Sequence, residues 1–183
     1  MQSNQKYAFS WRLLHWLVAV LVAGLIPIGL WMASRGAANI WDDLTNTLYG
    51  AHKAIGFTVL WLMVLRVLIR WRKGQPPYPA SMPRILIVAA SILHLLLYVL
   101  LFATPLLGWA AVTAYPALIT LGDYHLPAMP FVPQSEALAK QLFNIHGTLA
   151  LVLGVLILGH IAAGLKHLLI NRDGIFQRMW FGK

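Results

Sequence analysis

Long apolar stretches without charged residues dominate the chain and predict membrane-spanning helices. Residues 13–34, 85–122 and 141–165 each contain no Asp, Glu, Lys or Arg, and about 20 helical residues are enough to cross the hydrocarbon core of a bilayer. A fourth apolar segment, residues 50–71, has basic residues near both ends, where long side chains can reach the membrane surface. In the stretch 85–122, the prolines and glycines after position 104 predict that the helix ends before residue 122.

The expected fold is therefore all-α, an integral membrane four-helix bundle that forms one domain over residues 1–183. Its spans are expected at about 11–34, 44–72, 84–112 and 138–169. No small-residue cleavage pattern follows the first apolar run, so we expect that span to be retained and not removed as a signal peptide.

Composition supports a membrane protein and excludes several classes of chemistry. Apolar residues make up 60% of the chain and charged residues 10%, against roughly 45–50% and 25% in soluble proteins. The chain has no Cys, which excludes disulfides, thiolate metal sites and thiol nucleophiles. The net charge of +9 comes from basic residues that flank apolar runs, a pattern that favours membrane orientation and argues against nucleic acid as a partner.

The distribution of basic residues predicts the orientation of the bundle in membrane lipid. Four spans place both termini on one side, and the basic residues on that side outnumber those opposite by eleven to three. By the positive-inside rule both termini of this multi-pass protein are then cytoplasmic. The eleven are Lys6, Arg12, Arg66, Arg70, Arg72, Lys73, Arg84, Lys166, Arg172, Arg178 and Lys183, and the three are Arg35, Lys53 and Lys140.

Four of the seven histidines fall at two matched depths within the expected spans. His52 and His146 lie near the outer ends of their spans, and His15 and His160 near the inner ends. His146 and His160 are 14 residues apart, which is roughly 1400° of rotation, so they share one face of a helix at an axial separation of about 21 Å. Ionisable groups inside a bilayer indicate function, and we predict two separate sites, His52 with His146 and His15 with His160.

The chemistry that best fits these pairs is two haem b groups, each with two axial histidines, because haem iron accepts imidazole ligands and a four-helix bundle can hold a cofactor in its core. The residue four positions after each predicted ligand is small, which leaves room for a macrocycle; these residues are Ala19, Gly56, Ala150 and Gly164. Zinc is a weaker alternative because its site needs three or four ligands at one depth. With both axial positions taken, single-electron transfer is favoured over oxygen activation.

Three basic residues lie where haem propionates are expected. Arg66 is 14 residues after His52 and faces the core near the inner pair, and it is the best propionate candidate; Lys53 and Arg12 are candidates at the two ends, although anchoring at the membrane surface is the favoured role for both. Three more histidines have less defined roles. His94 has no obvious partner; a polar group satisfied within the bundle is its favoured role, and a quinone contact is the alternative. For His167 a solvated or lipid-contacting role is favoured over quinone binding or proton transfer, and no function is assigned to His125.

The chain resembles the bacterial cytochrome b561 family over nearly its whole length. The resemblance is carried by FSWRLLHW at 9–16, YGAHKAIGFTVLWLMVLRVLIR at 49–70, NIHGTLALVLGVLILGHIAAGLKH at 144–167 and NRDGIFQRM at 171–179, with the proline-rich inner linker at 74–84 and the LGDYHLP stretch of the outer loop. It implies a four-span di-haem b protein of the bacterial inner membrane that exchanges electrons with the quinone pool, with ligands at the same four histidines. Some members are associated with oxidation of superoxide and transfer of the electron to ubiquinone. The family often has a second histidine after the position of His167, where this chain has Leu168.

Two other functions fit the same spans. The chain could be the cytochrome b anchor subunit of a larger membrane dehydrogenase or hydrogenase, which would require an exposed docking surface, although the outer loops are short. It could also be a structural or transport bundle without haem. The sequence leaves open the electron donor, the type of quinone and the oligomeric state.

Overall fold

Four long helices form the protein. The computed structural model describes residues 6–79, 82–117, 120–121, 124–125 and 127–182; parts of the proline-rich linker and of the LGDYHLP stretch, and Lys183, lie outside these ranges. The elements are α1 (Phe9–Ala37), α2 (Asp43–Lys73), α3 (Arg84–Ala114), the two-residue strands β1 (Thr120–Leu121) and β2 (Tyr124–His125), α4 (Glu136–Lys166), a π-helical turn η1 (His167–Asn171) and a 3-10 turn η2 (Phe176–Arg178).

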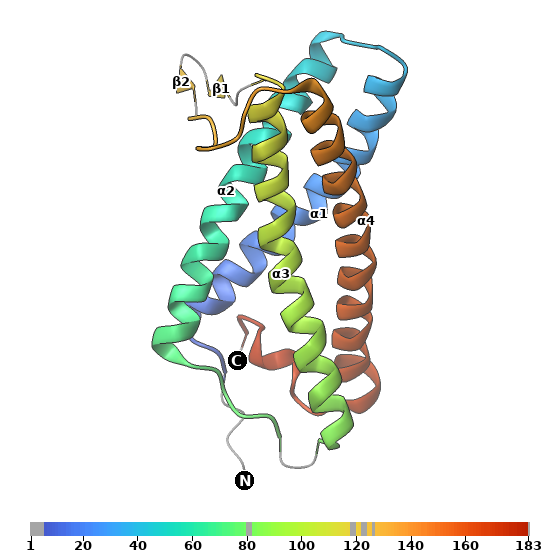
Figure 1. Ribbon diagram of the computed structural model, residues 1–183. Coiled ribbons are helices and arrows are strands. Elements are labelled where there is room, and N and C mark those ends of the chain that lie inside the picture. The colour runs from blue at the N-terminus through green and yellow to red at the C-terminus, as the bar shows by residue number, and fades with distance from the viewer. Residues whose placement is uncertain (1–5, 80–81, 118–119, 122–123, 126, 183) are drawn as a thin grey trace.

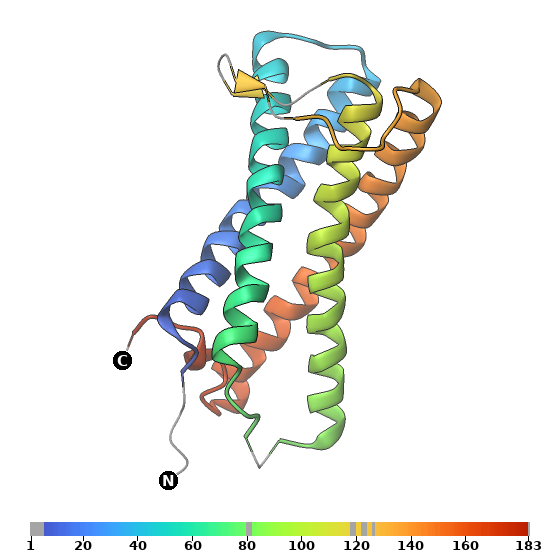
Figure 2. The same cartoon turned by 60° about the vertical axis from the view of Figure 1, so that its left-hand side comes forward.

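The helices run up and down, so both ends of the described chain lie at one end of the bundle (Figure 1). We call this the tail end, and the opposite end, with the α1–α2 and α3–α4 connections, the loop end. α1 packs closely on α2, α3 packs closely on α4, and α2 joins the two pairs through α3. α1 crosses the bundle obliquely, and α2 and α4 lie diagonally across from each other (Figures 1 and 2). Four helices are long and apolar enough to cross a membrane, which confirms the predicted all-α membrane bundle.

Local signals explain where the helices begin and end. The Asp42 side chain caps α2 by accepting a hydrogen bond from the Thr45 amide at 2.8 Å, and Gly74 ends it with a φ of +66°, a conformation that glycine adopts without strain. Ser135 caps α4 in the same way through the Leu138 amide. The two-stranded antiparallel β1–β2 ladder is confined to the loop between α3 and α4.

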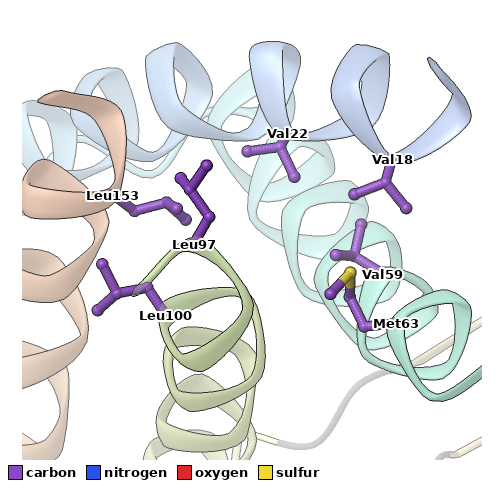
Figure 3. Packing of buried hydrophobic residues seen from close by; sticks show 7 residues of the cluster. All are labelled: Val18, Val22, Val59, Met63, Leu97, Leu100 and Leu153. Carbon is purple, nitrogen blue, oxygen red and sulfur yellow. The ribbon is translucent and has the colours of Figure 1, made fainter. Parts of the chain in front are cut away.

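A layer of packed apolar side chains crosses the middle of the bundle. All four helices contribute to it, and Figure 3 shows its seven most buried members: Val18, Val22, Val59, Met63, Leu97, Leu100 and Leu153. Leu153 lies midway in sequence between His146 and His160 on α4. The layer therefore separates the loop-end half of the bundle interior from the tail-end half.

The outward faces of the helices are strongly apolar. Val20, Ile85 and Val155, on three different helices, are 68%, 77% and 69% exposed in the isolated chain. Surfaces of this kind are buried against lipid tails when a bundle lies in a membrane.

Candidate cofactor sites between paired histidines

The structure brings the four predicted histidines together as two facing pairs. His52 of α2 faces His146 of α4 at the loop end, with ring centres 6.2 Å apart and ring planes at 78°. His15 of α1 faces His160 of α4 at the tail end, with ring centres 6.1 Å apart and the same interplanar angle. All four side chains are half-buried and point into the bundle.

The spacing of both pairs fits one metal ion held between two imidazoles. A metal–imidazole bond is about 2.0 Å long and a ring centre lies about 1.1 Å from its nitrogen, so two imidazoles on opposite sides of one ion have centres about 6.2 Å apart. Haem iron takes two such ligands and obtains its other four bonds from the macrocycle. Within the described chain, no group of three or more His, Asp or Glu side chains is arranged to hold a metal ion. The donor sets therefore fit haem.

His146 has a defined orientation because its second ring nitrogen is bound by the backbone. Its Nδ1 lies 2.8 Å from the carbonyl oxygen of Thr104 on α3. A carbonyl can only accept a hydrogen bond, so Nδ1 carries the hydrogen and donates it, which leaves the Nε2 lone pair available for iron. The Nδ1 atom of His52 is buried and makes no hydrogen bond within the described residues.

Arg66 contacts a predicted ligand directly. Its Nη2 donates to Nδ1 of His15 at 3.1 Å, because a guanidinium has no acceptor atom. In this arrangement the hydrogen of His15 lies on Nε2, so His15 can bind iron through Nε2 only after Arg66 releases Nδ1. Arg66 and Arg70 also lie over the ring of Tyr98, at 5.3 and 5.6 Å.

The other two basic candidates lie farther toward the ends of the bundle. Lys53 at the loop end donates to the carbonyl oxygen of Ala117 at 3.3 Å. Arg12 at the tail end donates to the carbonyl oxygen of Trp180 at 2.7 Å. Both therefore hold backbone of neighbouring segments in this structure.

His94 has a partner that the sequence did not reveal. Its ring centre lies 5.4 Å from that of His160, which is closer than in either facing pair. His94 also lines a cavity of about 310 Å³ between α2 and α3 at the tail end. Tyr98 lines the same cavity, and its hydroxyl is buried without a hydrogen-bond partner among the described residues. Tyr98 was not predicted as a site residue, because its role depends on helix packing.

The tail, residues 172–182, folds back across the tail end of the bundle (Figure 2). Trp16 donates from its indole to the carbonyl oxygen of Met179 at 2.9 Å and packs edge-on against His15 and Trp180. Arg178 donates to the carbonyl oxygen of Pro77 at 2.6 Å and so joins the tail to the linker after α2. The tail thus covers the His15–His160 pair on the side away from the apolar layer.

The tail begins with an ion pair between His167 of η1 and Asp173. His167 Nδ1 lies 2.6 Å from the Asp173 carboxyl, which also accepts from the Ile175 amide. Burial raises the pKa of this carboxyl, but the hydrogen bonds from His167 and Ile175 outweigh burial and hold the pKa below its usual value. His125 lies exposed in β2, away from both pairs.

Acidification is expected to loosen the tail. The pKa of Asp173 is lower in the folded protein than in the unfolded chain, so its contribution is full above the unfolded value of about 3.9 and is lost as the pH falls through the lower folded value. The protection factors of the amides of residues 172–182, which correct for the intrinsic pH dependence of hydrogen exchange, should be constant from neutral pH down to about pH 5 and should fall below about pH 4. Asp173→Asn should show low protection factors at every pH, and a pH response in this variant equal to that of the parent would contradict the assignment.

Comparison with known proteins gives a consistent set of similarities. Residues 6–182 match the family model described as prokaryotic cytochrome b561. The chain is 33% identical to cytochrome b561 homolog 2 of Escherichia coli strain K12, over 96% of this chain and 91% of that protein. It is 30% identical to cytochrome b561 homolog 1 of the same strain, over 91% and 92%. It is also 27% identical to a probable superoxide oxidase CybB of Yersinia pestis, over 96% of both chains.

Proposed function

Because this chain belongs to the prokaryotic cytochrome b561 family, which implies haem b and electron transfer in a bacterial membrane, we propose that it is a di-haem cytochrome that moves single electrons across the inner membrane and exchanges them with quinone. The observation that carries the proposal is the spacing of the two histidine pairs, 6.2 and 6.1 Å between ring centres. Each pair has the separation that two imidazoles take on one iron, and each lies in a separate half of the bundle.

In this proposal His52 with His146, and His15 with His160, would each hold one haem b. Haem b, when bound, would supply a reversible one-electron couple. His146 donates from Nδ1 to the Thr104 carbonyl, which holds its ring orientation and raises its basicity. Arg66 would leave Nδ1 of His15 and pair with a propionate, which is the charge-assisted pairing that a guanidinium favours.

The apolar layer keeps water and ions away from the path between the two sites. Met63 is fully buried in this layer, and the side chains of Val18 and Leu153 are nearly so. Low local polarity is one of the properties by which a protein tunes the potential of a haem. The layer therefore lets electrons pass between the sites while no polar route connects them.

The cavity beside His94 is the proposed site of the quinone head group. It lies next to the tail-end pair, and its lining combines apolar surface with polar side chains that can bind carbonyl oxygens, as expected for a small-molecule site. His94, Tyr98 and Arg70 supply donors there. The buried Tyr98 hydroxyl without a partner would gain one from a quinone oxygen.

The charge asymmetry supports a bundle with its tail end in the cytoplasm, because eleven of the fourteen Lys and Arg residues lie on that side. An electron donor then acts at the loop end. Superoxide is the donor to test first, since a relative that is 27% identical is described as a probable superoxide oxidase.

Electron transfer across a sealed membrane tests the proposal. The purified protein should show a low-spin haem b spectrum, and vesicles that contain it should reduce trapped ferricyanide when ubiquinol is added outside. His52→Ala should abolish this reduction, because the loop-end site is needed to complete the path, whereas His125→Ala should leave it unchanged. A colourless preparation, or equal rates with and without protein in the vesicles, would refute the function.

A further inference from the structure

Two glycines form the surfaces against which the loop-end imidazoles rest. A Cβ atom added to Gly108 of α3 would lie 3.1 Å from Cε1 and 3.2 Å from Nδ1 of His146. A Cβ added to Gly29 of α1 would lie 3.1 Å from Cε1 of His52. Real Cβ contacts are rarely this short, so each imidazole occupies space that any other residue at the glycine would need.

Gly108 ends a helical turn that begins at a carbonyl bound to the same ring. Thr104, four residues before Gly108, accepts the hydrogen bond from Nδ1 of His146. Gly29 provides only the close approach, because Nδ1 of His52 makes no hydrogen bond among the described residues. A glycine therefore meets a ligand ring twice, on α1 for the ligand of α2 and on α3 for the ligand of α4.

We infer that Gly108 with the Thr104 carbonyl positions His146, and that Gly29 positions His52, so that α1 and α3 set the orientation of both ligands of the loop-end haem without contributing a ligand to it. The inference rests on the proposed function. The glycine determines how close the helix backbone approaches the ring, and the carbonyl determines which nitrogen faces the iron. α3 carries no proposed ligand, yet it positions the ring of His146.

The chain offers matched control glycines for a direct test. Gly147 is the neighbour of His146 and Gly24 lies five residues before Gly29 on α1, and a Cβ at either position would meet nothing within 4 Å. We expect Gly108→Ala and Gly29→Ala to weaken haem binding at the loop-end site about 10- to 100-fold, the usual effect of disturbing groups that orient a ligand. Gly147→Ala and Gly24→Ala should keep both haems with unchanged electron paramagnetic resonance signals and midpoint potentials.

A double variant separates positioning of His146 from general damage to helix packing. In the His146→Ala background the imidazole is absent, so adding Gly108→Ala should change neither the remaining haem content nor the melting temperature. A further loss of haem or stability there would overturn the inference, as would Gly108→Ala behaving like Gly147→Ala in haem content, resonance signal and potential. If His146→Ala itself keeps both haems, the proposed function has failed; if it loses one while Gly108→Ala is unaffected, only this inference has failed.

Discussion

Replacing His146 by alanine is expected to lower the haem content of the purified protein from two per chain to about one, since an iron that loses one of its two protein ligands is weakly held. The same loss is expected for His52→Ala, His15→Ala and His160→Ala, because each removes one member of a facing pair. Haem is measured as the pyridine haemochrome against protein from amino-acid analysis. The haem signal that disappears from the electron paramagnetic resonance spectrum should be the same for His146→Ala and His52→Ala. His15→Ala and His160→Ala should both lose the other haem signal.

His94→Ala is the decisive control for the tail-end site. The ring of His94 lies 5.4 Å from that of His160, too close for iron to bind between them in the manner of the facing pairs, so this variant should retain both haems. His125→Ala, in the exposed β2 strand, should also retain both. Retention of both haems in His146→Ala would refute the loop-end assignment, and loss of one haem in His94→Ala but not in His15→Ala would make His94 the ligand.

The sequence was sufficient for the membrane bundle because apolar length and helical phase are local properties. Three charge-free windows and one apolar segment with basic ends predicted four long apolar helices, and the described part of the structure confirms them. The 14-residue interval between His146 and His160 predicted one shared face, and both side chains meet partners on other helices. Histidines at matched depth can be paired once the number of spans and the direction of each span are known. The distribution of basic residues also constrains that direction.

The residues that support the sites could not be predicted, because they depend on how the helices cross. Gly108 fell inside the span expected at about 84–112 and was given no role in a site, whereas in the structure it lies within α3 and faces His146. His94 appeared to have no partner because only the packing of α3 on α4 brings it to His160. The available signal was a glycine on the face of one helix that packs against another helix. Small residues are common at such helix contacts for many reasons, so this signal does not identify a site.

Arg66 and the tail illustrate a second limit, which is the effect of distant segments. Helical phase placed Arg66 at the depth of the tail-end pair, but not in contact with Nδ1 of His15. The tail crosses the bundle through backbone carbonyls that accept from Arg12 and Trp16. Backbone acceptors are present at every residue, so no sequence pattern distinguishes the ones that are used.

Replacing His94 by leucine is expected to slow the reduction of haem by ubiquinol about tenfold or more while both haems remain, because one buried hydrogen bond to a polar ligand is worth about 1–3 kcal/mol. Tyr98 also lines the cavity, and Tyr98→Phe should act in the same direction, since it removes a buried hydroxyl that has no partner among the described residues. Rapid mixing with ubiquinol, followed at the haem band, measures both rates.

Ser91 provides the matched control for the quinone cavity. It lines the same space, but its hydroxyl already donates to the Ile87 carbonyl at 2.8 Å, so Ser91→Ala should reduce at the parental rate. Oxidation of a donor at the loop end should stay normal in the first turnover of His94→Leu, because electrons enter there without the cavity. Slow entry of electrons from both ends would instead indicate that the haem itself has changed. If His94→Leu and Tyr98→Phe are both reduced by ubiquinol at the parental rate, the quinone binds elsewhere on the protein.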